Sequence, residues 1–258
     1  MAEFNGDDLS GSRFYEVDLT KAHFENVEMT SARFQNVYLT GSILRGLWLE
    51  DVDIDGEIRN VTINGVDIGP LIEAELDKRH PERTKLHPTD AEGFREAWAV
   101  VERAWLPTIE RARRLPPEAL HERVEGEWSF IETLRHLLSA TDAWVSRAIL
   151  GDPSPYSALG LMHTEAKDIP GVPNDRSARP GLDEVLALRA DRTATVRRVM
   201  ADLTDDKLAA RTEPVMEPGY PESESFEVKR CLQAVVNEEW QHRLFAERDL
   251  AVLESRQS

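Results

Sequence analysis

A large apolar side chain stands at every fifth position over the first 54 residues of this 258-residue chain. Neither a helix, with about 3.6 residues per turn, nor a strand, with a period of two, places every fifth residue on one face. A backbone that turns through a fixed angle in each block of five residues does place them together. The period therefore predicts a coil that stacks on itself. The apolar positions are Phe4, Leu9, Phe14, Leu19, Phe24, Met29, Phe34, Leu39, Leu44, Leu49 and Ile54.

A smaller residue stands two positions before most of the large ones, and the two series change together with a period of ten. In most pairs Ala or Ser precedes Phe, whereas Val precedes Leu or Met. Large and small side chains in alternation suit a narrow core of fixed cross-section. These positions hold Ala2, Asp7, Ser12, Val17, Ala22, Val27, Ala32, Val37, Ser42, Leu47 and Val52.

These paired positions resemble the motif of the pentapeptide-repeat family, which centres on Leu or Phe with Ala or Val two residues earlier. The resemblance implies a short right-handed quadrilateral β-helix with four pentapeptides per coil. With about 20 residues per coil and a strand spacing of about 4.8 Å, the stack is about 15 Å tall. Near Gly56 the register slips by one residue, and the repeats are then expected to continue as Ile58, Ile63 and Ile68.

The formal net charge of −17 argues against nucleic acid or an anionic membrane as a partner. The single cysteine, Cys231, excludes an internal disulfide and fits a reducing compartment. The chain starts without a basic segment followed by an apolar one, and no apolar run approaches the ~20 residues of a membrane span. We therefore expect a cytoplasmic protein that binds neither nucleic acid nor membrane.

Acidic residues are concentrated in residues 1–79, which carry 16 acidic and 7 basic side chains for a net charge of −9. An acidic β-helix raises the hypothesis of DNA mimicry, because some pentapeptide-repeat proteins bind topoisomerases in place of DNA. A turn of duplex measures about 34 Å, more than twice the height of the expected stack. We therefore interpret these residues as the solvated outer surface of a small β-helix.

Gly69-Pro70 ends the repeats, and two short segments are expected before a second domain. Residues 71–77 predict a short helix that caps the open end of the coil, since an exposed β-helix end needs a cover. Pro81 and Pro88 predict a linker, because a residue before proline disfavours helix. The expected domains are a β-helix over residues 1–69, a capping helix and linker over 70–87, and a helical domain over 88–258.

Apolar residues spaced by three or four predict helices in the second domain. A capping box formed by Ser129 and Glu132 begins the second of them, and Gly151 ends it. Residues 151–180 are rich in Pro, Gly and Ser and are expected to form a long crossover loop. Four helices with one long connection predict an antiparallel four-helix bundle. The expected helices span residues 88–114, 129–150, 182–203 and 226–254.

Three residues with metal-binding side chains are expected to meet inside this bundle. His136 lies on the apolar side of its helix. Glu238 and His242 are four residues apart, which places them on one helix face with Cβ atoms about 5–6 Å apart. Two imidazoles and a carboxylate are costly in an apolar interior unless something satisfies them, and a divalent metal would satisfy all three.

A set of two His and one Glu leaves one or more metal positions open, as in catalytic rather than structural sites. These ligand types suit zinc first. Iron(II), nickel and manganese stay open as alternatives, because two His and one carboxylate also describe open non-haem iron sites.

A second resemblance is carried by Trp128-Ser129, by His136 eight residues after the Trp, and by a late helix that contains His242. This pattern resembles the DinB-like superfamily of four-helix metal-binding bundles. That superfamily commonly has two His four residues apart on its last helix, and here Glu238 takes the place of the first. The mycothiol-dependent maleylpyruvate isomerase branch has a His, Glu, His set, so the resemblance implies that His136, Glu238 and His242 are the metal ligands.

The resemblance covers about residues 90–256 and implies a metal-dependent thiol S-transferase or isomerase. Its cosubstrate would be a low-molecular-weight thiol of the mycothiol or bacillithiol type, whose pKa the metal lowers for attack on a small-molecule electrophile. The alternative is a non-catalytic interaction protein, in which the β-helix binds a partner protein or forms a homodimer. A hydrolase is a third hypothesis and needs a general base, but Glu239 points about 100° away from Glu238.

Four other residues have a structural interpretation beside a functional one. Cys231 is expected to be a small core residue. His163 is expected to be an exposed loop residue, with a position over the mouth of the bundle as the alternative. Arg243 and Arg248 are expected to be solvated or paired near the end of a helix rather than to bind an anionic substrate.

Overall fold

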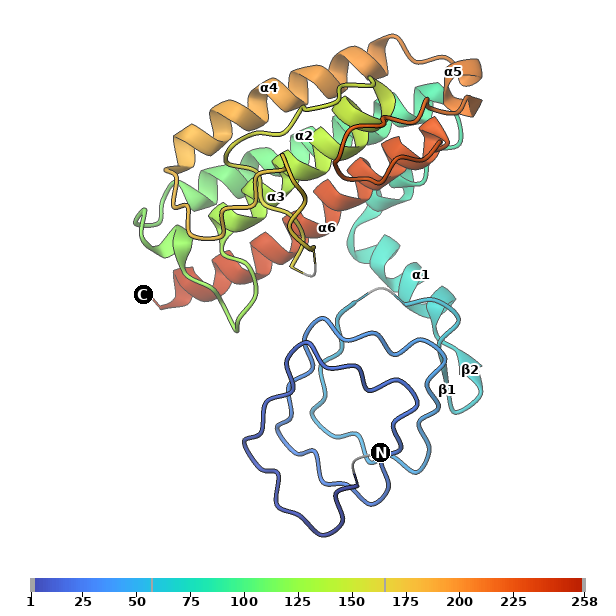
Figure 1. The fold of residues 1–258 in the computed structure, drawn as a ribbon, viewed down its shortest axis with the longest axis vertical. Helices are drawn as coiled ribbons and strands as arrows, with labels where there is room; N and C mark the ends of the chain where they lie inside the picture. The colour runs from blue at the N-terminus through green and yellow to red at the C-terminus, as the bar shows by residue number, and fades with distance from the viewer. Residues whose placement is uncertain (1–2, 57, 165, 257–258) are drawn as a thin grey trace. The chain divides into compact units, whose positions relative to one another are not determined.

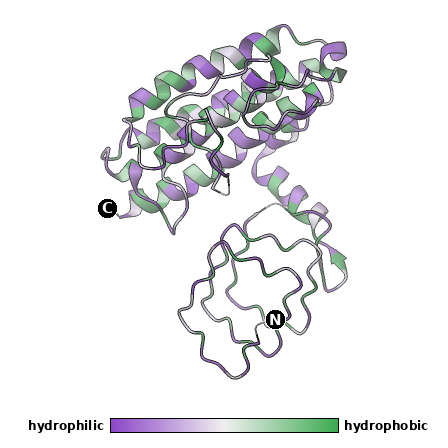
Figure 2. Cartoon of the chain, in the orientation of Figure 1, coloured by the Kyte–Doolittle hydropathy of each residue, from purple (hydrophilic) through white to green (hydrophobic). Residues whose placement is uncertain are grey.

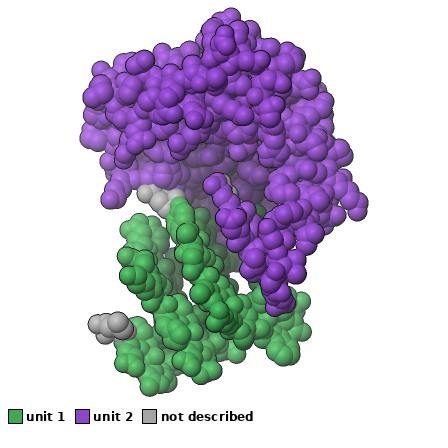
Figure 3. Space-filling model, turned by 90° about the vertical axis from the view of Figure 1, so that its right-hand side faces the viewer, with its two compact units in different colours: residues 1–57 green, residues 58–258 purple. Residues whose placement is uncertain are grey.

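The structure is a computed structural model that describes residues 3–56, 58–164 and 166–256. The repeat position Ala2 lies outside the described residues, as do Met1 and Ser258, where the first expected domain begins and the last one ends. Contacts between residues divide the chain into two compact units, residues 1–57 and 58–258, which Figure 3 colours separately. The expected domain boundaries stay a prediction.

The backbone of the first unit repeats every five residues. A residue with positive φ, between 51° and 74°, follows two positions after each successive apolar repeat residue from Phe4 to Leu49. Because only Gly and a few polar residues adopt this conformation readily, the motif reserves one position in five for it. These residues are Gly6, Gly11, Glu16, Lys21, Asn26, Ser31, Asn36, Gly41, Gly46 and Asp51.

The period of ten is also present in this backbone. The N–H groups of Ser12, Ala22, Ala32 and Ser42 each donate to the carbonyl three residues earlier, at 2.9–3.1 Å. The acceptors are Leu9, Leu19, Met29 and Leu39 of the apolar series. The alternation of residue pairs along the sequence is therefore matched by an alternation of hydrogen-bonded turns and open bends.

The side chains of this unit are exposed rather than packed. Every described residue from 3 to 56 is exposed, including Phe4 at 63% and Leu9 at 42%. Polar and apolar residues alternate along the coils (Figure 2), and no strand is formed among these residues. The structure thus shows the five-residue period of the chain and does not show a β-helix.

The segment that follows forms a β-hairpin. Strand β1 (Thr62–Ile63) pairs antiparallel with β2 (Val66–Asp67), and Ile63 lies opposite Val66. Asn64 and Gly65 connect the strands with φ values of 51° and 80°, as a two-residue hairpin turn requires. The expected continuation of the repeats through Ile63 is therefore replaced by a hairpin, because Asn-Gly is the stronger local signal here.

Two short helices connect the hairpin to the long helices. Helix α1 (Gly69–Arg79) includes the short helix expected at 71–77, and the 3-10 helix η1 (Pro81–Leu86) occupies the expected linker. The buried Arg83 of η1 donates to Glu73 at 2.6 Å and to Asp77 at 2.7 Å, both on α1. The capping role of α1 stays a prediction.

Long helices make up most of the second unit (Figure 1). The bounds lie within a few residues of those expected, and a π-helix, η3, continues the second of them, where an α-helix to Leu150 was expected. Gly151, with φ of 73°, follows its end as predicted. The elements are α2 (Ala91–Ala112), η2 (Ala119–His121), α3 (Phe130–Thr141), η3 (Asp142–Ile149), α4 (Leu182–Ala201), α5 (Asp205–Ala209) and α6 (Val228–Ser255).

Helices α2 and α6 run parallel. The hydroxyl of Thr108 donates to Glu247 at 2.7 Å, and about one turn further along α2 and two turns further along α6, Arg111 donates to Glu254 at 2.9 Å. Residue numbers therefore increase in the same direction on the two helices.

Helices α3 and α4 each run opposite to α2 and α6. His136 lies beside Glu238, whereas Ala148 packs near Cys231, so numbers decrease along α6 as they increase along α3 and η3. Arg197, late in α4, donates to Glu102 of α2, whereas Asp183, early in α4, pairs with Arg113 just after the end of α2. Residue numbers therefore increase in opposite directions on α4 and α2.

It follows that α3 and α4 are parallel to each other, so the expected antiparallel arrangement is wrong for this pair. Because α3 and α4 point in the same direction, a long connection must carry the chain from the end of η3 back to the end of the unit at which α3 begins. Residues 150–181 provide this connection. The helices contact one another as the pairs α2 and α6, α6 and α3, α3 and α4, and α4 and α2.

One apolar core lies between these helices. Phe94, Leu134, Val196 and Leu232, one from each of them, are fully buried. This core fixes the face that each helix turns inward, and hence the direction of the polar side chains interspersed on it. Within the described ranges, no helix combines the length and the apolar character that a membrane crossing requires.

Candidate metal centre

The start of α3 places His136. Ser129 accepts a hydrogen bond from the N–H of Glu132 at 3.3 Å, and the Glu132 carboxylate accepts one from the N–H of Ser129 at 2.9 Å. This is the predicted capping box, which satisfies two N–H groups that a helix start leaves without partners. Because the helix begins at Phe130, His136 falls two turns in and turns toward α6, where it is buried.

Helix α6 supplies the other two side chains. Glu238 and His242 are one turn apart, and Nδ1 of His242 lies 2.9 Å from the carbonyl oxygen of Glu238. The same nitrogen lies 3.2 Å from the Glu238 carboxylate. The helical spacing expected from the sequence therefore places this pair on one face.

The three predicted residues meet. One potential ligand atom from each of His136, Glu238 and His242 lies within 4.8 Å of the others. Nε2 of His136 is 3.3 Å from Oε2 of Glu238. The side chains are 11%, 35% and 18% exposed in that order, so the cluster is largely buried and opens to solvent on the side of Glu238.

Backbone carbonyls orient both imidazoles. Nδ1 of His136 lies 3.1 Å from the carbonyl oxygen of Leu161, and Nδ1 of His242 faces that of Glu238. A carbonyl only accepts hydrogen bonds, so each Nδ1 carries a proton, and in the neutral imidazole each Nε2 then has a free lone pair. This is the arrangement that metal-binding His residues usually have.

When His136 is neutral in this way, no proton lies between its Nε2 and the carboxylate of Glu238. With Nδ1–H donating to Leu161, the Nε2 lone pair of His136 faces the Oε2 lone pairs of Glu238 at 3.3 Å. Two acceptors at this distance repel each other unless a proton or a cation lies between them. The donor set therefore calls for a positive charge at this point.

The separation of His136 and Glu238 suits a metal ion. Four ligands at about 2.0–2.1 Å from a tetrahedral zinc lie about 3.3–3.4 Å apart. The 3.3 Å between Nε2 of His136 and Oε2 of Glu238 matches such an edge. Three protein ligands would leave at least one position for a substrate.

Aromatic rings cover one side of the cluster. The indole of Trp128 lies 4.6 Å from the ring of His136 and 6.0 Å from that of His242, centroid to centroid. Phe245 lies edge-on to His242 at 5.9 Å. These rings keep water from the apolar side of the imidazoles. The sequence motif contained Trp128, but not this packing role.

The charge states also favour metal binding. Burial alone raises the pKa of Glu238, but the contact with His136 and the positive charge that His136 and His242 carry when protonated lower it on balance. Burial, together with His136, lowers the pKa of His242 to about 4. At neutral pH the carboxylate is charged and His242 is neutral, which are the forms that bind a metal.

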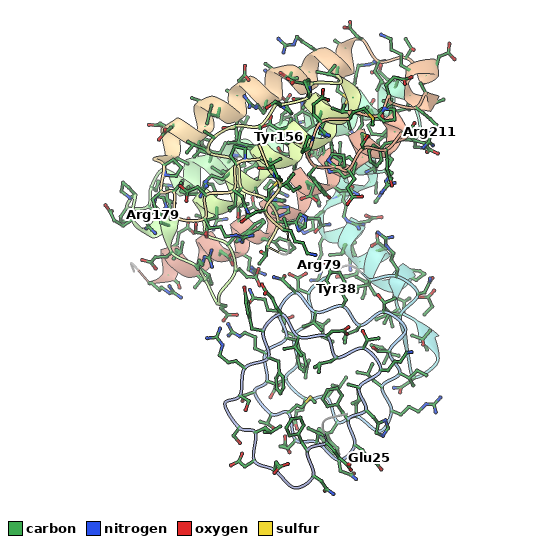
Figure 4. All side chains as sticks on the ribbon, viewed as in Figure 1. Glu25, Tyr38, Arg79, Tyr156, Arg179 and Arg211 are labelled. Carbon is green, nitrogen blue, oxygen red and sulfur yellow. The ribbon has the colours of Figure 1, made fainter. Side chains whose placement is uncertain are left out.

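The crossover loop and the segment before α6 also reach the centre. His163 is half-buried rather than exposed, contrary to expectation, and its ring lies 5.6 Å from that of Tyr220. His163 helps to lower the pKa of Glu238, and burial, together with the charge of Glu238, raises the pKa of the partly buried Tyr220. The hydroxyl of Tyr156 (Figure 4) accepts from the N–H of Tyr220 at 2.9 Å and donates to its carbonyl at 3.1 Å.

Glu239 lies away from the centre. Its carboxylate accepts from the buried Arg189 of α4 at 2.8 Å. The guanidinium of Arg189 also lies over the ring of Trp105, at 5.0 Å from its centroid. Glu239 is thus a structural partner of α4 and is not placed to act as a general base beside Glu238.

The other candidates have structural environments. Arg243 pairs with Glu247, and Arg248 pairs with Asp249, each at 2.7 Å, as expected for paired rather than anion-binding residues. Cys231 is fully buried, and burial raises the pKa of its thiol to about 11, as expected for a core residue.

Comparison with known families agrees with both resemblances. The DinB superfamily matches residues 100–246, which is more than half of the chain and includes the three clustered residues. Pentapeptide repeats match in 8 copies over residues 8–46. No curated protein and no solved structure shows a significant match to the chain. The predicted order of the two families along the chain is confirmed.

Proposed function

The chain belongs to the DinB superfamily, and we propose that it is a metal-dependent enzyme that joins a low-molecular-weight thiol to an electrophile. His136, Glu238 and His242 would be the metal ligands. Membership of a superfamily whose domains often bind metals supports this assignment.

One observation carries the proposal. Nε2 of His136 and Oε2 of Glu238 face each other at 3.3 Å while Nδ1 of His136 is already bonded to a carbonyl. A purely structural His in a core has no need of a second acceptor at its free nitrogen. A cation at this point would satisfy the His, the carboxylate and His242 together.

The reaction is a substitution or addition at carbon. A divalent metal in this position would lower the pKa of a thiol that enters its open position. In the substitution, a sulfur–carbon bond forms, the bond from that carbon to its leaving group breaks, and the thiol proton leaves to solvent. An isomerisation would follow if the electrophile instead adds the thiol, changes geometry and releases it again.

The residues around the cluster would define how substrates enter. Glu238 is the most exposed of the three ligands, so the open side lies next to it. His163 and Tyr220 would border that side, because both interact electrostatically with Glu238 and their rings lie 5.6 Å apart. Trp128 and Phe245 offer apolar surface on the other side, which suits a small electrophile with an apolar body.

We propose zinc as the metal, with iron(II), nickel or manganese as alternatives, because the ligand set of two imidazoles and a carboxylate suits each of them. The thiol would be of the mycothiol or bacillithiol type, in keeping with a cytoplasmic protein. For the fold, we propose that the repeats close into a right-handed quadrilateral β-helix and that α2, α3 with η3, α4 and α6 form a four-helix bundle.

The test is a thiol-transfer assay on zinc-loaded protein. Mycothiol, bacillithiol and glutathione are each offered with 1-chloro-2,4-dinitrobenzene, and the thioether product is quantified. We expect product with at least one thiol, and a loss of turnover by a factor of about 100 or more in Glu238→Gln. Glu110→Gln, an exposed Glu on α2, is the matched control and keeps full turnover. Equal rates in Glu238→Gln and wild type would refute the assignment.

The alternative is a non-catalytic interaction protein, and the exposed apolar side chains of the repeats favour it. In that case the first unit binds a partner protein or a second copy of the chain. Removing the metal would then lower the melting temperature while no thiol gives product. A hydrolase is less well supported, because Glu239, the general base that such a reaction would need, is paired with Arg189.

A further inference from the structure

We propose that Arg135 is a positioning residue for the metal centre. It would hold the crossover loop so that the Leu161 carbonyl fixes the imidazole of His136. The inference rests on the proposed role of His136 as a ligand, and it concerns how this chain orients that ligand before a metal binds.

Arg135 is buried completely and points into the loop. Its Nε donates to the carbonyl of Leu159 at 2.9 Å, and its two terminal nitrogens donate to those of Ala178 at 2.9 Å and Asp175 at 2.5 Å. One guanidinium thus joins the beginning and the end of the crossover loop. We call the part of the loop that Arg135 holds in this way the arch.

The next residue of the helix uses the same loop. The N–H of Leu161 donates to the carbonyl of Arg135 at 3.2 Å, and the carbonyl of Leu161 accepts from Nδ1 of His136 at 3.1 Å. The N–H of Met162 donates to the side chain of Asn174 at 3.1 Å, which closes the arch beside this contact. The position of the Leu161 carbonyl therefore depends on the arch.

A guanidinium in this position costs free energy. Carbonyl groups satisfy its N–H groups but do not neutralise the charge of a guanidinium that is completely buried. An apolar side chain would fill the same space at lower cost. A role in fixing a single loop conformation explains why an arginine occupies the site.

The consequence for His136 is a fixed tautomer. With Nδ1–H bonded to Leu161, the lone pair of Nε2 points to Glu238, at 3.3 Å from Oε2. If the loop shifts, either ring nitrogen is free to carry the proton, and part of the population presents N–H in place of a lone pair. Groups that orient a ligand in this way commonly contribute about 10–100-fold to metal affinity.

Arg147 provides a matched control. It lies in η3, is equally buried, and donates to the backbone carbonyls of Pro153, Val215, Glu217 and Pro221. None of these hydrogen bonds involves a carbonyl that contacts His136, Glu238 or His242. Replacing Arg147 therefore reproduces the loss of a buried, loop-binding guanidinium without disturbing the ligand.

The experiment compares Arg135→Met, Arg135→Lys and Arg147→Met with wild type, after circular dichroism has established which variants are folded. Zinc affinity is measured by competition with a chelating dye. His tautomers are read from long-range proton–nitrogen NMR spectra of metal-free protein. We expect Arg135→Met to bind zinc about 10–100-fold more weakly and to show both tautomers of His136. Arg147→Met keeps the wild-type affinity and tautomer, and Arg135→Lys recovers part of the loss.

Wild-type affinity and a single tautomer in Arg135→Met would overturn the inference, as would an equal loss in Arg147→Met. If Arg135→Met does not fold, Arg135→Lys decides, because a lysine keeps the charge but reaches fewer carbonyls. If wild-type protein takes up no zinc, the proposed function fails, while the tautomer of His136 in metal-free protein still tests the role of Arg135.

Discussion

Two adjacent glutamates on α6 have opposite environments. Glu238 lies at the metal centre with its carboxylate partly open to solvent, whereas Glu239 is buried against Arg189 at 2.8 Å. The rotation of about 100° per residue in a helix accounts for the difference. The sequence alone made Glu239 a candidate only for a hydrolase, and its partner on α4 shows that its role is structural.

We predict that Glu239→Gln lowers stability and leaves the metal centre intact. The substitution removes the charge that compensates the buried Arg189, and breaking a buried pair in this way costs about 3–5 kcal/mol. Urea unfolding of the zinc-loaded protein measures the loss, and elemental analysis measures the metal. A loss of metal without a loss of stability would show that Glu239, and not Glu238, lies at the centre.

At the scale of single elements, the sequence predicted helix starts better than helix directions. The start of α3 was predicted because Ser129 and Glu132 make a local pattern that needs no tertiary information. Apolar spacing marks the buried face of a helix but not the end from which the chain enters, so the parallel pair of α3 and α4 was missed. The length of the crossover loop was the available signal.

The candidate centre was predicted for the same kind of reason. His136, Glu238 and His242 are side chains with distinct chemistry at helical spacing, and both features are visible in a sequence. The carbonyl of Leu161 and the packing of Trp128 were not predictable, because every residue has a carbonyl and a loop has no period. The π-helix η3 likewise had no side-chain signal.

We predict a pH dependence for the capping box of α3. Burial raises the pKa of Glu132, but the hydrogen bonds from Arg123 and Ser129 lower it by a larger amount. Its folded pKa is therefore below its unfolded value of 4.5. The contribution of Glu132 to stability is therefore complete above that value and is lost as the pH falls through the folded pKa.

Urea unfolding of wild type and Glu132→Gln across this pH range tests the prediction. At pH 7 the variant should be less stable by about 1 kcal/mol, the typical worth of a helix cap. The difference between the two proteins should shrink as the pH falls below 4.5 and through the folded pKa of Glu132. A constant difference between them would mean that the charge of Glu132 does not matter.

At the scale of the whole molecule, the sequence predicted the packing of the second unit better than that of the first. In residues 58–258, apolar spacing predicted helices that bury their apolar faces in one core. In residues 3–56, the period predicted a repeating backbone, and positive φ values do recur every five residues, but the apolar side chains are exposed. A five-residue period specifies where the chain turns, and it does not by itself specify how tightly successive coils pack.

We predict that the helical unit does not need the repeats for its metal. Removing residues 1–57 leaves the core and all three clustered residues in place. The fragment 58–258 should keep the zinc affinity of the full chain to within about threefold, which corresponds to less than about 1 kcal/mol. Titration of both proteins with zinc under identical conditions measures this. A much weaker affinity in a folded fragment would mean that the repeats contribute to the centre.

The central claim is that His136, Glu238 and His242 hold one divalent metal, and elemental analysis tests it most directly. Wild type, His136→Ala and the exposed control His87→Ala are purified without a chelator or a His tag. We expect about one metal ion per chain in wild type and in the control, and almost none in His136→Ala. No metal in wild type, even after incubation with zinc, iron and nickel, would contradict the account.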